Sequence, residues 1–125
     1  MNRIILLLAG IFILCSAYEC NKSKSARLRG KLVIKELCSH FVVQVISGNV
    51  DTSKVVNEWK DEKRKATFDK VFTVANRCDF PSGLDEGDEF EFSFDLNPAP
   101  QNCAVCMAYY PIPAKTNPIK IQQEK

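Results

Sequence analysis

The chain has 125 residues, of which 46% are hydrophobic and 10% aromatic, and its formal net charge is +2 at pH 7. This length suits one domain with one hydrophobic core and is too short for two. The composition is that of an ordinary globular protein rather than a disordered one. The small net charge gives no electrostatic footprint for nucleic acid, so no nucleic-acid partner is predicted.

Residues 1–19 are predicted to be a secretory signal peptide. Arg3 precedes an apolar run over residues 4–14, and small residues follow at 15–17. A positive segment, about 7–15 apolar residues and a small-residue cleavage site are typical of export signals, and such a run is too short to span a bilayer. The sequence therefore predicts an exported protein, either periplasmic or anchored to a membrane, with secretion as the alternative.

Two alternatives remain open for the processed N-terminus. Cleavage after Ala17 leaves a chain that starts at Tyr18, because Cys15 and Ala17 are small and two positions apart. Lipidation of Cys20 instead leaves a membrane-anchored protein, although Glu19 departs from the small residue that a lipobox has before its cysteine. We favour lipidation, because it leaves four cysteines that can pair fully, whereas simple secretion leaves five and hence one free thiol.

Residues 20–29 are predicted to form a flexible basic tether ahead of the folded domain. They contain Lys22, Lys24, Arg27 and Arg29 and no acid. Beside a lipidated cysteine, each of these cations would lie close to anionic headgroups and add about 1 kcal/mol of attraction to the surface. The membrane, reached through the lipid anchor, is thus the one partner that the sequence predicts; a merely solubilising tether is the alternative.

Residues 30–125 are predicted to form a single all-β domain, a small OB-like barrel or compact sandwich of five to six strands with one short helical insert. Runs rich in β-branched residues, bounded by turn residues, predict the strands. The expected strands span residues 31–37, 40–46, 67–75, 88–95, 103–110 and 117–122. The helical insert is expected over 54–65, where Val55, Val56 and Trp59 share one side of a short helix.

The clearest of these strands is 88–95, in which Phe90, Phe92 and Phe94 alternate with polar residues. The two-residue period of a strand places all three rings on one face. The acids between the rings then lie on the solvated face of the strand rather than in a calcium site or a catalytic carboxylate pair, and their spacing excludes an EF-hand loop.

Four cysteines, Cys38, Cys78, Cys103 and Cys106, are expected to form two disulfides, and sequence leaves the three possible connectivities open. Each disulfide stabilises a small domain by about 2–4 kcal/mol. Cys103 and Cys106 form a CxxC motif, so a thiol–disulfide redox protein using that pair is the alternative function. The βαβ context of such a motif is absent from the sequence. Zinc binding by the four thiolates is disfavoured, because only one close pair exists and an exported compartment favours oxidation.

Neither a cofactor nor a metal site is predicted, and His40 is the only histidine on which a hydrolase triad could be built. Trp59, Tyr109 and Tyr110 are the candidates for a binding surface, because large rings with a polar handle recur at recognition surfaces. Adjacent residues of a strand point to opposite faces, so one of the two tyrosines is expected outside. The favoured function is a non-enzymatic binding or structural module of the bacterial envelope, with its protein or small-molecule partner unknown.

Several segments of the chain form a recognisable set: GKLVI at 30–34, NRCDFP at 76–81, EGD at 86–88 and CAVCMAYYP at 103–111. Together they resemble a family of small exported Bacteroidetes proteins of unknown function, OB-like with a CAVC motif near the C-terminus. The resemblance implies an exported bacterial protein with cysteines at these places, and it implies no activity. The OB-like pattern is also similar to the netrin-like protease inhibitors, which present an N-terminal cysteine; that reading requires Cys20 to be a free first residue, and lipidation excludes it.

Overall fold

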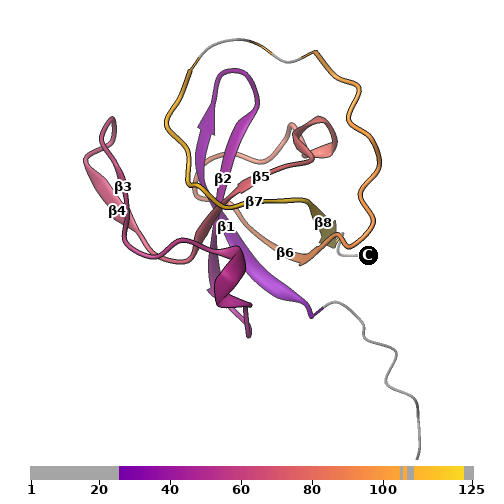
Figure 1. The fold of residues 1–125 in the computed structure, drawn as a ribbon, viewed down its shortest axis with the longest axis horizontal. Helices are drawn as coiled ribbons and strands as arrows, with labels where there is room; N and C mark the ends of the chain where they lie inside the picture. The colour runs from indigo at the N-terminus through magenta and orange to yellow at the C-terminus, as the bar shows by residue number, and fades with distance from the viewer. Residues whose placement is uncertain (1–25, 105, 107–108, 123–125) are drawn as a thin grey trace, which may run out of the picture.

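The computed structural model describes residues 26–104, 106 and 109–122 (Figure 1). Their elements, in chain order, are β1 (Leu28–Glu36), β2 (His40–Ser47), the 3-10 helix η2 (Thr52–Lys54), β3 (Trp59–Asp61), β4 (Ala66–Phe68), β5 (Val71–Val74), the 3-10 helix η3 (Arg77–Asp79), β6 (Glu89–Phe94), β7 (Thr116–Asn117) and β8 (Ile119–Gln122). The predicted all-β class is confirmed. No helix in this part of the chain is long and apolar enough to cross a membrane.

Six of the strands form one curled sheet in the order β7-β5-β2-β1-β6-β8 (Figure 1). Its two edge strands, β7 and β8, are separated in the chain only by Pro118. Strand β7 pairs parallel to β5, and β8 pairs antiparallel to β6. The single bent segment 116–122 therefore joins both edges of the sheet and gives it the form of a partly open, OB-like barrel.

The inside of the barrel is filled by aromatic and aliphatic side chains. Phe92 is fully buried and Phe90 nearly so, and Phe94 packs against the same core, as the alternation in β6 predicts. The ring of Phe72 in β5 lies 5.7 Å from that of Phe92 and 5.4 Å from that of Phe94, measured between centroids. Strand β2 contributes Val43 to this core by the two-residue period of a strand.

A second apolar cluster lies on the outer face of β1, β2 and β5. Its members Ile34, Val42 and Val71 are fully buried. A shift of register between Leu32 and Ile34 marks a β-bulge in β1. Such an extra residue moves the side chains that follow it to the other face of the sheet, which places Ile34 outside the barrel. The hairpin β3–β4 packs over this cluster through Trp59.

The helical insert predicted over 54–65 is wrong, because most of this segment forms the hairpin β3–β4, which lies to the left of the other strands in Figure 1. Between residues 52 and 65, helical backbone is confined to the single turn η2. Its N-terminal end is capped by Asp51, whose carboxylate accepts a hydrogen bond from the N–H of Ser53. Positive φ angles of 52° at Glu58 and 51° at Lys65 stand directly before β3 and β4, respectively. Such left-handed residues interrupt a helix, whatever the spacing of its apolar side chains.

Three strand boundaries also differ from the prediction. The expected strand 67–75 is divided into β4 and β5 by Lys70, whose φ is 52°. The expected strand 103–110 is wrong: its described residues are irregular and belong to the long connection from β6 to β7. Strand β1 begins at Leu28, so the segment predicted as a tether, 20–29, overlaps the folded domain at its end.

Candidate functional site

Two disulfides fix the long connection between β6 and β7. Cys38 in the β1–β2 turn is bonded to Cys106, and Cys78 in η3 is bonded to Cys103, with Cα–Cα distances of 5.1 and 5.6 Å. The structure thus selects one of the three pairings that sequence allows. Because the two cysteines of the CxxC motif have different partners, the motif lacks the internal disulfide on which a redox centre of this kind depends. The disulfides indicate an oxidising, non-cytoplasmic location.

The turn of hairpin β3–β4 carries a cluster of charged side chains around Arg64. The guanidinium contacts three carboxylates: Glu36 at 2.9 Å, Asp61 at 3.2 Å, and Glu86. The hydroxyl of Tyr110 donates a hydrogen bond to Asp61 at 3.1 Å and accepts one from Arg64. The cluster therefore ties the hairpin to the end of β1, to the loop before β6 and to the connection that follows the disulfides.

The electrostatics of this cluster favour its charged state. Burial raises the pKa of Asp61, whose side chain is 1% exposed, but hydrogen bonds from Tyr110 and Arg64 outweigh that effect and hold the pKa below its usual range. Burial and the hydrogen bond to Asp61 raise the pKa of Tyr110 to about 12. Both pKa values therefore lie further from neutral pH than usual, whereas acid–base catalysis needs groups with a pKa near the working pH. The cluster is thus suited to clamping the hairpin.

The aromatic residues that the sequence analysis selected lie in different settings. Tyr109 is 89% exposed. Tyr110 is half-buried in the charged cluster, and Trp59 is half-buried against Phe68, with ring centroids 6.3 Å apart. These three residues therefore do not form one exposed surface. The predicted lipidation site, Cys20, lies outside the described residues.

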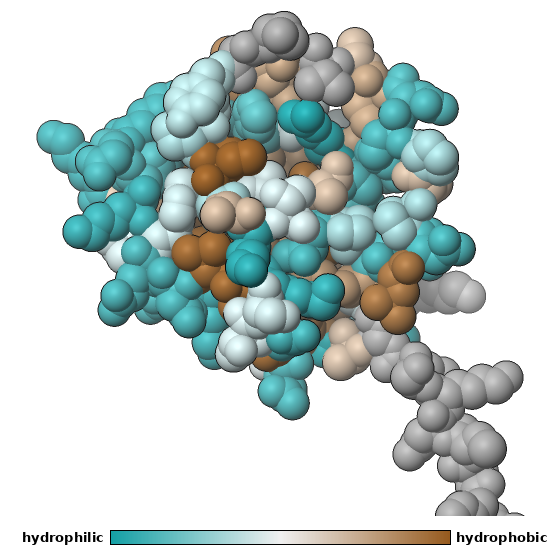
Figure 2. Space-filling view, in the orientation of Figure 1, coloured by the Kyte–Doolittle hydropathy of each residue, from teal (hydrophilic) through white to brown (hydrophobic). Residues whose placement is uncertain are grey.

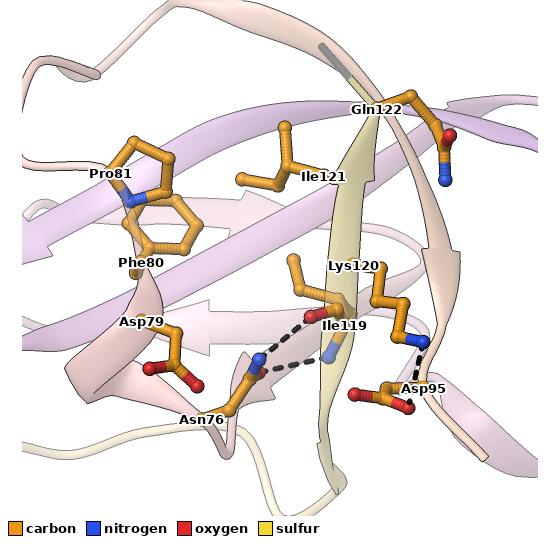
Figure 3. A pocket seen from close by; sticks show the side chains of 9 residues that line it. All are labelled: Asn76, Asp79, Phe80, Pro81, Asp95, Ile119, Lys120, Ile121 and Gln122. Carbon is orange, nitrogen blue, oxygen red and sulfur yellow. Dashed lines mark hydrogen bonds and ion pairs between the residues drawn. The ribbon is translucent and has the colours of Figure 1, made fainter. Parts of the chain in front are cut away.

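A pocket that the sequence analysis did not identify lies beside β8 (Figure 3). Its volume is about 480 Å³. Phe80, Pro81 and Ile121 form an apolar side, while Asp79 and Asp95 belong to its polar rim. Figure 2 shows that apolar surface on the face seen there is broken into separate patches among hydrophilic side chains. Apolar walls with a few polar groups are the usual lining of a ligand site.

The pocket lies where the backbone pairing between β5 and segment 116–122 ends, at Asn76. The last backbone bond runs from the N–H of Ala75 to the carbonyl of Asn117, at 2.9 Å. The side chain of Asn76 then replaces the backbone: its Nδ2 donates to the carbonyl of Ile119 at 2.7 Å, and its Oδ1 accepts from the N–H of Ile119 at 2.9 Å (Figure 3). Beyond Asn76 the chain turns into η3, so β5 offers no partner to Ile121.

The outer edge of β8 presents the backbone of Ile121 to the pocket. The N–H of Asp95 donates to the carbonyl of Pro118 at 2.9 Å, which fixes the antiparallel ladder between β6 and β8. Backbone groups alternate along such a ladder, so those of Lys120 face β6, and those of Ile119 and Ile121 face away. Within the described residues, Asn76 satisfies Ile119, and no hydrogen bond is made to the outward N–H or C=O of Ile121.

The rim of the pocket has more negative than positive charge. Asp95 lies 3.8 Å from the ammonium of Lys120, which is 65% exposed. The carboxylate of Asp79 accepts a hydrogen bond from Gln101 at 3.0 Å, and no ion pair joins it to a lysine or arginine of the described residues. The rim therefore suits a cationic or hydrogen-bonding group attached to an apolar body.

Comparison with known proteins places the chain in no family: no family model, curated protein or solved structure matches it. In residues 26–104, 106 and 109–122, no three His, Cys, Asp or Glu side chains gather as a metal site requires. The pocket is consequently interpreted from its own geometry.

We expect Asp61→Asn to lower the free energy of unfolding by about 1.5–3 kcal/mol at pH 7, because it weakens charge-assisted hydrogen bonds with Arg64 and Tyr110. The pKa of Asp61 is lower in the folded state, so this contribution is fully present above its unfolded pKa of about 4 and is lost as pH falls through the folded value. Urea unfolding at a series of pH values measures the difference. The exposed neighbour Glu62 provides the control Glu62→Gln, and a deficit of Asp61→Asn that stays constant down to pH 2 would contradict the assignment.

Proposed function

We propose that the protein is a non-enzymatic, exported binding module that takes its ligand at the pocket beside β8. The observation that carries the proposal is a pocket of about 480 Å³ at an incompletely paired strand edge, with an apolar side and a charged rim. The pocket is built on the backbone of β8 and on the anchored segment after η3. Binding sites of this kind are placed on rigid elements because their geometry then needs little reordering when the ligand arrives.

The hairpin β3–β4 covers the other surface of the barrel on which a ligand could bind, the outer face of β2 and β5. OB-like barrels bind ligands on the face of the second and third barrel strands and on the loops beside it. Here the corresponding face carries Val42 and Val71, which are fully buried beneath β3–β4. Arg64 clamps that hairpin in place, and the Cys38–Cys106 disulfide ties together the adjoining loops. The pocket beside β8 has no such cover among the described residues.

The finer part of the proposal is that a lipid on Cys20 holds the module at a bacterial envelope membrane. It is supported by the pairing of the four domain cysteines, which leaves Cys20 without a disulfide partner among them. Since β1 begins at Leu28, the tether would reach at most about 30 Å from the membrane. Arg29 lies within β1, 3.7 Å from Glu89, so it belongs to the folded domain and not to the proposed tether.

Nuclear magnetic resonance with a library of small fragments tests the binding function directly. We expect fragments with an apolar body and a cationic end to shift the backbone amides of residues 119–122 and of Asp79 in the exported protein. Pro81→Trp should abolish these shifts by filling the apolar side of the pocket, and Lys115→Trp, which adds the same ring at an exposed position elsewhere, should preserve them. A library in which no fragment shifts these amides would contradict the proposal.

The intact mass of the protein, produced from the full chain in a bacterium that acylates lipoproteins, tests the anchor. We expect a chain that begins at Cys20 and carries a diacylglyceryl group, because acylation uses the one mature cysteine outside the two disulfides. Alkylation under non-reducing conditions should add nothing to that mass. An unlipidated chain that begins at Tyr18 and takes up one alkyl group would overturn the anchor and leave the pocket unaffected.

A further inference from the structure

The outer edge of β8 has the chemistry of a strand that lacks a neighbour. The N–H and C=O of Ile121 point away from β6, and Ile121 itself lines the pocket. An edge strand with unpaired backbone groups is a template for pairing with another extended segment. Many peptide-recognition domains use this mode: backbone bonds supply affinity, and pockets for alternate side chains supply specificity.

Asn76 demonstrates that this edge accepts an amide in strand-like geometry. Its side-chain amide both donates to and accepts from Ile119, as one residue of a neighbouring strand would, at 2.7 and 2.9 Å. Ile121 is the next residue whose backbone faces the same direction. A peptide strand laid beside β8 after Asn76 would therefore continue a ladder that β5 and Asn76 have already begun.

We propose that the pocket binds an extended peptide segment of a partner protein, which adds as a strand to β8 at Ile121. The proposal rests on the proposed function and names the ligand class of the same site. An apolar side chain of the peptide packs against Phe80 and Pro81, and a neighbouring lysine or arginine meets Asp79. This pattern follows from the lining of the pocket, which is apolar on one side and acidic at the rim.

Charge distinguishes such a partner from a second copy of this chain. Two copies joined through β8 would bring the acidic rim of one pocket, with Asp79 and Asp95, towards the same rim of the other. Like charges that face each other across an interface suppress that pairing, whereas a basic peptide complements the rim. Asp79 is the stronger attraction for such a peptide, because Asp95 already lies near Lys120.

Selection of random dodecapeptides displayed on phage, with the exported protein as bait, provides the probes. We expect enriched sequences in which apolar residues alternate with lysine or arginine. Synthetic copies should shift the amide of Ile121 in nuclear magnetic resonance spectra. N-methylation of the peptide residue that donates to Ile121 should weaken binding about three- to tenfold, as expected for one lost hydrogen bond.

Variants of the protein test the two halves of the contact separately. Asp79→Asn keeps the acceptor for Gln101 and removes the charge, so it should weaken the binding of basic peptides. The control variant Glu62→Gln, which removes a charge away from the pocket, should bind them as the unmodified protein does. Ile121→Pro removes the outward N–H without removing a bond to β6, and Ile121→Ala, which keeps that N–H, is its control. We expect peptide affinity to fall further in Ile121→Pro than in Ile121→Ala.

The results separate this inference from the function on which it rests. Fragments that bind the pocket while no selected peptide shifts Ile121 would overturn the peptide proposal and retain the binding module. Selected peptides that are indifferent to N-methylation and to Asp79→Asn would also overturn it. A dimer that forms through β8 in sedimentation equilibrium, or binding of the chain's own N-terminal segment at Ile121, would assign the edge to those occupants and contradict a partner peptide. Failure of fragments and peptides alike would overturn both proposals.

Discussion

The fold depends on one bent segment, residues 116–122, which pairs with two different strands. Before Pro118 it bonds to β5, and after Pro118 it bonds to β6. The segment thereby holds both edges of the curled sheet. The pairing with β5 ends at the side chain of Asn76, which bonds to Ile119. The next outward backbone groups of β8, those of Ile121, therefore have no partner in the described structure. The pocket is a direct consequence of this change of partner.

The rest of the molecule limits where a ligand can bind. The hairpin β3–β4 buries the outer face of β2 and β5, and Arg64 holds that hairpin through three carboxylates and Tyr110. The two disulfides anchor the long connection to the β1–β2 turn and to η3. Charged and covalent contacts therefore stabilise one end of the barrel, while the edge of β8 remains accessible. A rigid frame with one incompletely paired strand is well suited to recognising an extended segment.

Sequence predicts the parts of this structure that depend on local pattern. The alternation of Phe90, Phe92 and Phe94 identifies β6 and its inward face, and the pattern that predicts an export signal correctly predicts that the four domain cysteines are disulfide-bonded. Spacing alone misassigns 54–65, because Val55, Val56 and Trp59 fit a helix while left-handed backbone at Glu58 prevents one. The pocket is not visible in any local pattern, since it arises where Asn76 bonds to Ile119, 43 residues away.

Hydrogen exchange at individual amides of β8 tests the central claim, that the outer edge at Ile121 is open. The N–H of Ile119 bonds to Asn76 and that of Lys120 faces β6, so both should be protected. We expect the N–H of Ile121 to exchange faster than either of its neighbours in the disulfide-bonded protein without added ligand. An Ile121 amide as protected as those of Ile119 and Lys120 would show that another segment already pairs with this edge, and would contradict the account.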